Sequence, residues 1–593
     1  MKKLFPSMLC FMAFTSMITA KTIYVTPTAS NAAGGGLSWS DPVGLTRAGS
    51  LATSGDVVYV MGGTYNYVKS TPTAGGAFGT SAGINYFGSF AGTETSPTER
   101  ATSDVDGNGN VDPWEFTNQT ILNFTLTNSS AGFITSNAST TTTNINGFKL
   151  TGTNTASTFS TGTNANQTIR IGRNIFFENN IISNWVVTST LDGTNLQTPF
   201  FAIADGYTAK INNCLFENNN ISYAATASLS SDSPFFPFIC LTNAPATAIT
   251  GNTMSNCVVR NNKVTMDYSS ASSTSANNMR GLIIAVKGPA ISTANPPADL
   301  SSTLQNTIVH NNEVKFIPQS GIYGCYGAVV YIYNQSTAAS DYILNCTIAN
   351  NKTTKCSSAG LKIGMDINAP HEKPNHVVMN NVLFNNFNND TINNIVANFP
   401  IPETSTTTVV SNISNGGAIN ITNAGFLQAN NLFDLSNNNA NETKGANFFK
   451  PTTAIGYIAD GSSEKSNWRI KSNSYLKWKG MQSNSSTDKA GFTFADKPSV
   501  GAYEFNNLIN GIQSTRGTGT FEVYPNPAQD IIKINTTANA HISIYTLTGA
   551  LITTVNSVIA GVQSINISNL PNGNYVVTLK SNGQILHQKL IKQ

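Results

Sequence analysis

The sequence predicts an all-β protein in which a long repeating solenoid precedes a small separate domain. Charged residues make up only 11% of the 593-residue chain and hydrophobic residues 40%, so the chain can bury a core without the charged helices common in cytosolic proteins. A phrase with alternating apolar positions also recurs through the middle of the chain, as stacked β-structure requires. The formal net charge of +3 argues against a nucleic-acid partner, which would need a strongly basic surface.

Residues 1–20 have the pattern of a secretory signal peptide. Lys2 and Lys3 precede an apolar run over residues 4–17, and Ala20 stands at the expected cleavage point. The run is shorter than the ~20 apolar residues that a membrane span needs, and no later stretch is long and apolar enough to cross a bilayer. We therefore expect a protein that is secreted or held at the outer cell surface, with no transmembrane segment in the mature chain.

Residues 21–117 are expected to form an N-terminal cap and the first coils. The sequence predicts a strand at Ile23–Val25, a short helix near Pro42–Ala48 and a turn at Gly55-Asp56. This order resembles the opening of secreted right-handed parallel β-helix proteins of the pectate-lyase-like superfamily. The resemblance implies that the helix caps the open end of the solenoid.

Residues 104–115, DVDGNGNVDPWE, follow the twelve-residue calcium-loop pattern. Oxygen ligands stand where the pattern requires them, and Gly109 falls at the sharp turn. The expected ligands are Asp104, Asp106, Asn108, the Asn110 carbonyl, Asp112 and Glu115. The flanking residues do not have the pattern of a helix pair, so the sequence predicts a lone structural Ca²⁺ site. A solvated acidic turn is the alternative.

The repeated phrase lies within residues 118–505, the predicted solenoid. It consists of Asn, four residues of which the third is apolar, and then Asn-Asn. Copies begin at Asn174, Asn213, Asn256, Asn306, Asn345 and Asn380. A fixed phrase with elastic spacing indicates stacked coils with insertions in their loops. A second apolar strand precedes most copies, which resembles a right-handed parallel β-helix. A β-propeller is the alternative, but the sequence has no four-strand blade signature.

Stacking of the copies predicts columns of equivalent side chains. Cys214, Cys257 and Cys346 fall in one inward column, where we expect buried free thiols, with a Cys214–Cys257 disulfide as the alternative. The six Cys of the mature chain leave the disulfide state open.

Two outward columns are also predicted. Glu178, Glu217, Arg260 and His310 share the first, which predicts a surface ladder of charges. An apolar column lies beside it and is expected to be covered by loops or by a partner. Its members are Phe176, Leu215, Val258 and Ile308.

The C-terminal region is predicted to be a linker, residues 506–518, followed by a separate domain, residues 519–593. The motif Val523-Tyr-Pro-Asn-Pro527, a Thr548-Gly549 turn and Leu570-Pro-Asn-Gly-Asn-Tyr575 occur in this order. Together they resemble the type A C-terminal sorting domain of the type IX secretion system. The resemblance implies a small β-sandwich, handling by the type IX secretion machinery, and attachment or release of the preceding passenger.

The catalytic signal is weaker than the fold signal. A uronate lyase needs a base for the proton alpha to the carboxylate and a cation for the enolate. The candidates are Lys287 at a strand exit, Arg280 at the start of that strand, and Tyr333 as a proton donor one coil away. Arg260, Lys263 and His310 are candidates for binding an anionic chain. Glu178 and Glu217, predicted to be adjacent, suit either a retaining glycosidase pair or plain surface carboxylates.

Two functions follow from these observations. One is a protein that binds or cleaves extracellular polysaccharide, with a uronate lyase as the specific form. The other is a non-enzymatic surface adhesin or structural protein. The glycan, the oligomeric state and the choice between anchoring and release remain open from the sequence.

Overall fold

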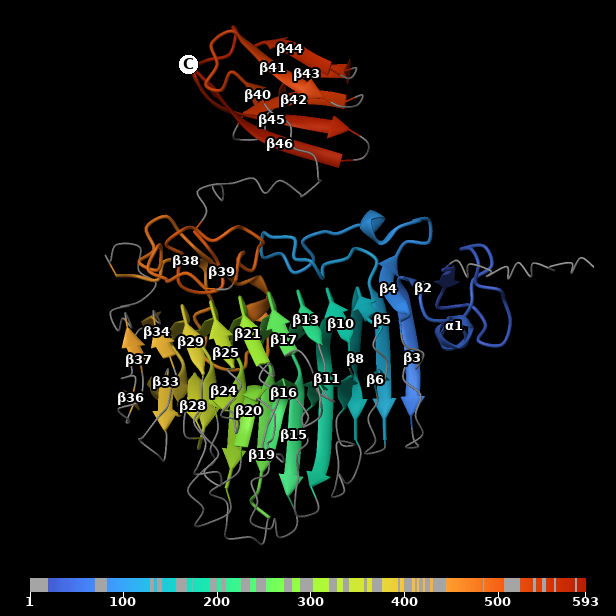
Figure 1. Cartoon of the computed structure of the whole chain (residues 1–593), viewed down its shortest axis with the longest axis vertical. Helices are drawn as coiled ribbons and strands as arrows, with labels where there is room; N and C mark the ends of the chain where they lie inside the picture. Colours follow the sequence, from blue (N-terminus) through green and yellow to red (C-terminus); the bar gives the residue numbers. More distant parts are fainter. Residues whose placement is uncertain are drawn as a thin grey trace, which may run out of the picture. The chain divides into compact units, whose positions relative to one another are not determined.

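The computed structural model describes residues 20–69, 83–127, 133–135, 141–155, 168–172, 174–191, 200–203, 209–225, 235–241, 252–270, 280–287, 302–318, 328–333, 341–356, 360–364, 376–392, 395–398, 408–410, 413–414, 420–421, 427–429, 444–483, 485–505, 523–536, 540–546, 551–558, 561–581 and 584–593. The chain divides into two compact units, Met1–Phe505 and Asn506–Gln593 (Figure 1). The expected signal peptide lies outside the described residues, apart from its last position.

The first unit is a right-handed parallel β-helix, because successive coils add strands to the same long parallel sheets (Figure 1). The first sheet runs from β1 to β37 in chain order. Its strands are β1 (Thr22–Val25), β2 (Val57–Met61), β4 (Asn85–Phe90), β7 (Thr143–Asn146), β10 (Ile175–Glu178), β13 (Lys210–Asn212), β17 (Asn252–Ser255), β21 (Ser302–Gln305), β25 (Tyr342–Leu344), β29 (Val377–Met379), β34 (Thr408–Val410) and β37 (Leu427–Ala429).

The second sheet begins with long strands and then divides. Its first strands are β3 (Gly63–Lys69), β5 (Thr120–Leu126), β8 (Phe148–Asn154) and β11 (Ile181–Leu191). From β11 onward each coil supplies a short and a long strand, because β11 pairs with both β14 and β15. The short column contains β14 (Leu215–Glu217), β18 (Val258–Arg260), β22 (Ile308–His310), β26 (Thr347–Ala349), β30 (Val382–Phe384) and β35 (Ile413–Ser414). The long column contains β15 (Asn220–Ala225), β19 (Lys263–Asp267), β23 (Glu313–Ile317), β27 (Lys352–Thr354), β31 (Phe387–Asn388) and the antiparallel β32 (Thr391–Ile392).

The third sheet closes each coil. Its strands are β6 (Phe133–Thr135), β9 (Ile169–Ile171), β12 (Phe201–Ile203), β16 (Phe235–Leu241), β20 (Arg280–Lys287), β24 (Ala328–Tyr333), β28 (Leu361–Gly364), β33 (Ile395–Asn398) and β36 (Asn420–Ile421). Apolar residues from all three sheets meet in one continuous core, which includes Phe177, Phe216 and Ile284. Alternation of apolar residues along short strands therefore produces the solenoid interior.

Asparagine makes the turns between columns. Left-handed Asn residues join the first sheet to the short column, and another set joins the short column to the long column. Asn tolerates this conformation better than most residues, since its short side chain hydrogen-bonds locally. The first set is Asn179, Asn213, Asn256, Asn306, Asn345 and Asn380, and the second is Asn184, Asn218, Asn261, Asn311, Asn350 and Asn385.

A buried amide ladder follows the second turn. The Oδ1 of Asn312 accepts the Asn262 Nδ2–H at 2.9 Å, and the Asn312 Nδ2–H is donated to Asn351 Oδ1 at 3.0 Å. Asn219 and Asn386 continue the same pattern at either end. Every one of these side chains is fully buried. The Asn-Asn pairs of the repeat are thus a turn residue followed by a ladder residue.

The first copy of the repeated phrase forms a different strand from the one that the repeat predicts. The segment beginning at Asn174 forms β10 of the first sheet, whereas the later copies form the short column. The true equivalent of Asn213 is Asn179, which has the same left-handed conformation at the same turn. Its N–H is donated at 3.1 Å to the carbonyl of Asn212, which ends β13 in the next coil. Both segments alternate apolar residues between Asn residues, so the phrase fits either strand. Consequently Phe176 lies outside the apolar column predicted for it.

The N-terminal cap matches the predicted order of elements. Strand β1 is followed by helix α1 (Leu45–Leu51), which buries Leu45 and Ala48. Gly55 has a left-handed φ of 96°, and the buried Asp56 carboxylate accepts the Thr53 N–H at 2.7 Å. The helix therefore begins three residues later than predicted, while the turn lies where it was expected.

The cysteines of the predicted inward column are buried free thiols. Cys214, Cys257 and Cys346 are fully buried. The Cys257 Sγ accepts the Cys214 N–H at 3.4 Å, so the two residues stack in successive coils without a covalent bond. The alternative disulfide is therefore absent between these two described cysteines. Cys240 and Cys356 are also buried free thiols, and Cys325 lies outside the described residues.

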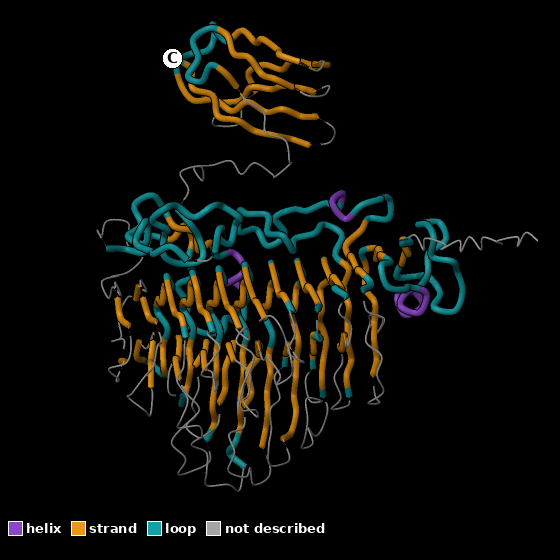
Figure 2. The backbone as a smooth tube through the Cα atoms, viewed as in Figure 1, coloured by secondary structure: helices purple, strands orange, loops and turns teal. Residues whose placement is uncertain are grey.

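The predicted apolar column is covered by a C-terminal part of the same unit. We call residues 444–505 the cover; it contains β38 (Phe448–Lys450), β39 (Asn467–Ile470) and the 3-10 helix η3 (Ser462–Lys465). Leu215, Val258 and Ile308 form one apolar cluster with cover residues such as Phe448 and Trp468. Figure 2 shows the cover as a mostly looped segment along the solenoid. The sequence predicted that either inter-coil loops or a partner would cover this column. The structure instead covers it with a C-terminal segment of the same unit.

The turn asparagines hold the cover in place. Amide groups of Asn350, Asn311 and Asn261 donate to the carbonyls of Thr452, Ala454 and Ile458 at 2.6 to 2.7 Å. Amide groups of Asn380 and Asn306 donate to the carbonyls of Met481 and Thr487, both at 2.7 Å. The cover thus passes twice over the coils, each time from later coils toward earlier ones.

The second unit is a small antiparallel β-sandwich. One sheet contains β40 (Val523–Tyr524), β41 (Ile531–Thr536) and β44 (Gly561–Asn566). The other contains β43 (Leu551–Val558), β42 (Ala540–Thr546), β45 (Gly573–Ser581) and β46 (Gln584–Lys592). Ile532, Ile544 and Val577 are among the residues that form its core. The Tyr575 hydroxyl donates to Pro571 O at 2.7 Å and ties the last turn to β45.

Candidate functional site

The segment 104–115 is a closed loop on a short β-type neck. Thr102 and Phe116 form an isolated antiparallel bridge, and the Ser103 N–H is donated to Glu115 O at 3.1 Å. Within the loop, Gly107 and Gly109 have left-handed φ values of 69° and 88°. The only regular helix flanking it among the described residues is the 3-10 helix η1 (Pro97–Glu99), so the expected lone loop is observed.

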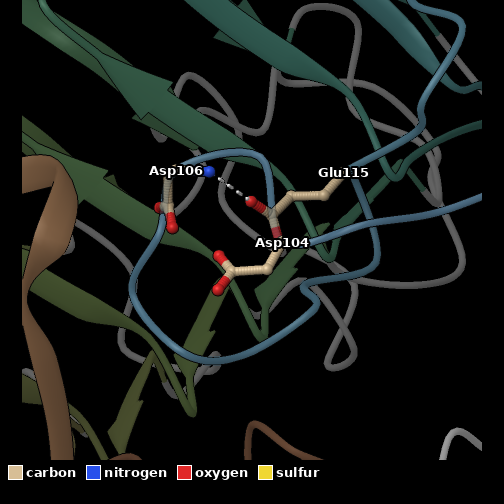
Figure 3. Close-up of side chains that lie close together, drawn as sticks. All are labelled: Asp104, Asp106 and Glu115. Atoms are coloured by element: carbon tan, nitrogen blue, oxygen red, sulfur yellow. Dashed lines mark hydrogen bonds between the residues drawn. The ribbon is translucent and has the colours of Figure 1, made fainter.

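Three of the predicted calcium ligands converge. The carboxylates of Asp104, Asp106 and Glu115 each offer an oxygen within 4.8 Å of the others. Figure 3 shows the three side chains close together. The Asp104 carboxylate accepts the N–H groups of Asn108 and Gly109 at 3.1 and 2.9 Å. Backbone N–H groups therefore fix the direction of the carboxylates before any ion is bound.

Glu115 is the buried member of the cluster. It is 2% exposed, and its Oε1 accepts the Asp106 N–H at 3.1 Å (Figure 3). Burial raises the pKa of Glu115 to about 7, and the neighbouring charge of Asp106 adds to the shift. Burial also raises the pKa of Asp106, although Arg260 opposes this shift. A bound cation would stabilise the ionised form of these convergent carboxylates, which burial and mutual repulsion disfavour.

The remaining predicted ligands have other partners. The Asn108 Oδ1 accepts the Asn110 N–H at 2.8 Å. Asp112 does not join the carboxylate cluster; its Oδ1 accepts the Lys489 Nζ–H at 3.2 Å. Lys489 is buried in the cover and lies 4.6 Å from the centre of the Trp114 ring. Burial is the largest single influence and opposes the charge of Lys489, but Asp112 and Tyr503 together outweigh it, so the pKa of Lys489 is raised.

Arg260 joins the loop, the solenoid and the cover. Its Nη2 donates to Asp106 Oδ2 at 3.0 Å and to Glu217 Oε2 at 2.9 Å, and its Nη1 donates to Glu464 O at 3.1 Å. The side chain is 3% exposed. Burial opposes its charge, yet the two carboxylates raise its pKa further. The structure therefore does not support the expected binding of an anionic chain by Arg260, because its buried side chain already donates to Asp106, Glu217 and the Glu464 carbonyl.

His310 is likewise enclosed. It is 1% exposed, its Nδ1 lies 2.8 Å from Asn311 Oδ1, and its ring centre lies 5.2 Å from that of Trp468. Burial lowers the pKa of His310 to about 3. Its predicted role in binding an anionic chain is not supported, since a neutral ring beneath the cover cannot meet one. The predicted ladder of charges in this column is therefore buried and not at the surface, although the expected ion pair between adjacent coils does form between Glu217 and Arg260.

Lys263 is the half-exposed member of the predicted binding set. In the long column Lys263 is in register with Glu313 of the next coil, and Glu313 is in register with Lys352 of the coil after that. Its Nζ lies 5.8 Å from the ring centre of Tyr457 in the cover. Lys263 thus lies at the rim of the cover and not beside Arg260 in a shared binding site.

The predicted catalytic positions lie on the third sheet. Lys287 ends β20 and is in register with Tyr333, which ends β24. Arg280 begins β20 and is in register with Phe235, about 23 Å from Lys287 at ~3.3 Å per residue. The backbone therefore brings Lys287 and Tyr333 together and separates Arg280 from them.

Glu178 and Glu217 do not form a carboxylate pair. Glu178 is in register with Asn212 of the first sheet, whereas Glu217 is in register with Ser183 of the second. Glu217 is held by Arg260, and burial raises the pKa of Glu178. The retaining glycosidase alternative is therefore wrong, and the error follows from the misplaced first repeat.

A small cavity of about 260 Å³ lies on the N-terminal coils. Its lining residues include Met61, Phe90, Asn118 and Gln119, and none of the lining residues is titratable. No motif in the sequence points to this cavity. It offers no acid or base, so it does not extend the candidate catalytic positions.

Comparison with known proteins identifies the second unit. Residues 522–593 match the family described as the secretion system C-terminal sorting domain. These residues form a sorting domain of the type IX secretion system, so the chain is exported to the cell surface or the extracellular space. The search of curated proteins found no match.

Two solved structures are similar to the chain over most of its length. One is the crystal structure of the pectate lyase Pel9A, with 14% identity, covering 83% of this chain and 98% of that chain, at a TM-score of 0.28. The other is the complex of XylC with xylose, with 10% identity, covering 82% and 98%, at a TM-score of 0.27. Within the described residues, no helix has the length and hydropathy to span a membrane.

Proposed function

We propose that the solenoid acts on an extracellular uronate polysaccharide by β-elimination, with Lys287 as the base and Tyr333 as the proton donor. The observation that supports this proposal is the register of the third sheet, which pairs the two positions at adjacent strand ends. Neighbouring strands lie about 4.8 Å apart. The lysine amine takes the proton alpha to the carboxylate, the glycosidic C–O bond breaks, and the phenol protonates the leaving oxygen.

The lyase proposal is tested with the purified full chain and polygalacturonate, alginate or chondroitin sulfate. Ultraviolet absorbance of unsaturated uronate ends reports cleavage. Lys287→Ala should lower the rate by at least ~100-fold, because a positioned base contributes about that much. Lys315→Ala on β23 is the matched control and should cleave normally. Activity that survives Lys287→Ala would remove this residue from the mechanism.

A non-enzymatic surface adhesin is the second candidate. It is favoured by the burial of Arg260 and His310, because the cover occupies the face where the sequence predicted an anionic chain to bind. Absence of cleavage on all three uronate polymers would favour this function over the lyase.

We also propose that residues 104–115 hold one structural Ca²⁺, with Asp104, Asp106 and Glu115 as carboxylate ligands. The supporting observation is the convergence of their oxygens on an ordered loop. Calcium supplies positive charge that offsets the repulsion between the carboxylates. An ion that binds only the folded state at 100 times its Kd stabilises it by about 2.7 kcal/mol.

The calcium proposal is tested by elemental analysis and thermal unfolding. Asp104→Ala with Glu115→Ala should remove one bound Ca²⁺ and abolish the fall in melting temperature that chelation causes in the natural protein. Asp460→Ala changes an exposed carboxylate of the cover and should keep both properties. A natural protein without bound calcium, and with no melting shift on chelation, would contradict the proposal.

A further inference from the structure

The cover presents an aromatic and basic surface that neither the calcium loop nor the proposed catalytic pair uses. We call Tyr475, Lys477, Trp478, Lys479 and Phe505 the Trp478 patch. Trp478 is 48% exposed, and Lys479 beside it is exposed. Tyr475 and Phe505 are partly buried against the cluster beneath the cover. Of the five Trp residues, all of which lie in the described part of the chain, Trp478 alone is exposed, and a lysine stands on each side of it.

Cations and rings alternate within the patch. The Lys477 Nζ lies 4.5 Å from the ring centre of Trp478 and 4.6 Å from that of Phe505. The Lys479 Nζ lies 5.0 Å from the ring centre of Tyr475. The Trp478 and Phe505 rings are 6.3 Å apart and nearly perpendicular. Positive charge is therefore held beside flat apolar surfaces.

The backbone beneath the patch is firmly attached. Leu476 is fully buried, and its carbonyl accepts the Val500 N–H at 3.0 Å. The Gly480 N–H is donated to Pro498 O at 2.7 Å, and the Met481 N–H to Asn380 Oδ1 at 2.9 Å. The rings are thus presented by a segment that is already ordered, which lowers the entropic cost of binding a ligand.

Trp478 also has an unfavourable backbone conformation. Its φ is 58°, in the left-handed region that bulky side chains rarely adopt. The surrounding hydrogen bonds hold the residue there, and the indole remains half-exposed instead of entering the core. Such strain at an exposed aromatic is typical of a binding residue.

The charge around the patch selects the ligand. Residues 471–483 contain three lysines and no carboxylate. Pro498, whose carbonyl accepts the Gly480 N–H, follows the exposed Lys497 in the sequence. Asp496, next to Lys497, is an exposed carboxylate. A uronate ring offers an apolar C–H face for an indole and a carboxylate for an ammonium group. A neutral sugar would use only the ring.

We infer that the Trp478 patch is a non-catalytic binding site for acidic, uronate-containing polysaccharide. The inference rests on the proposed function and deepens it, since it assigns a second site for the same class of polymer, outside the proposed catalytic pair. It does not depend on Lys287, which lies on the third sheet, and a protein without lyase activity can still bind through the patch.

The test is binding of the full chain to polygalacturonate, followed by tryptophan fluorescence and affinity electrophoresis. Trp478→Gly should weaken binding at least tenfold and keep or raise the melting temperature, because glycine accepts the left-handed backbone. Trp478→Phe should retain most of the binding. Phe449→Ala removes another partly exposed aromatic of the cover, 39% exposed, and should change binding less than twofold.

Polymer controls separate this site from a general polyanion surface and from catalysis. Fully methyl-esterified pectin should bind at least tenfold more weakly than polygalacturonate, and added salt should weaken binding of the acidic polymer. Lys287→Ala should bind normally even if cleavage stops. Equal binding of the esterified polymer or of single-stranded DNA, or unchanged binding by Trp478→Gly, would overturn the inference.

Discussion

Arg260 connects three parts of the chain that are far apart in sequence. Its guanidinium meets Asp106 of the loop, Glu217 of the preceding coil and the Glu464 carbonyl of the cover. A buried charge of this kind is tolerated because each partner offsets its desolvation. Removing one partner would leave the other charges buried without compensation, which makes the residue a structural junction and not a ligand-binding group.

His310 beneath the cover makes stability depend on pH. Its folded pKa of about 3 lies below the ordinary value near 6.5. The unfolded chain therefore binds a proton as the pH falls below 6.5, while the folded chain does not, and stability decreases from there toward pH 3. Lowering the pH from 6.5 to 5 should cost about 2 kcal/mol through this group.

Urea unfolding of the natural protein and of His310→Gln at pH 7 and pH 5 measures this contribution. Gln keeps a neutral polar group, so the variant should lose less stability at pH 5 by about that amount. Equal losses in both proteins would mean that His310 does not carry the acid sensitivity.

At the scale of elements, the amide ladder links the coils. The Asn312 side chain pairs with Asn262 and Asn351 and also donates to Val259 O at 2.9 Å. Asn312→Ala would leave several buried polar groups unpaired, each costing about 1–3 kcal/mol. We expect a loss of about 3 kcal/mol in the free energy of unfolding.

Chemical denaturation measures the free energy of unfolding of Asn312→Ala, and Asn123→Ala is the control. Asn123 pairs with Asn66 at the surface at 2.8 Å, so its loss should cost about 0.5 kcal/mol or less. Similar losses for the two variants would show that burial of the ladder adds nothing to its strength.

The elements that the sequence predicted are those set by local or periodic patterns. The Asn turns, the inward cysteines and the strand-helix-turn order of the cap depend on neighbours in sequence or on one repeat length. The first repeat was misplaced because β10 and the short strands share the same alternation. Burial of Arg260 and His310 could not be predicted, because the cover that encloses them has no repeat and contacts them across 156 to 204 positions. Lys489 was missed for the same reason.

At the scale of the whole molecule, passage from the periplasm to the cell surface should depend on the second unit. The sorting domain has its own core, and the solenoid forms a separate compact unit. Deleting residues 519–593 should trap the chain in the periplasm and leave the melting temperature of the solenoid unchanged.

Cell fractionation and surface proteolysis measure that outcome. Replacing the linker, residues 506–518, by a Gly/Ser segment of equal length is the control and should preserve export. Surface display of the truncated chain at the natural level would contradict the role of the second unit.

The two passes of the cover set an order of assembly. Ladder contacts between coils join residues 35 to 50 positions apart, whereas Lys489 meets Asp112 across 377 positions. Closing the longer loop costs more chain entropy, so we expect coil stacking to precede the Lys489–Asp112 contact. That contact would then form last, when the C-terminal residues of the first unit return to the loop near its beginning. A chain that ended before Lys489 would still stack its coils. Its loop at residues 104–115 would keep the contact between Arg260 and Asp106 but would lose the contact between Lys489 and Asp112.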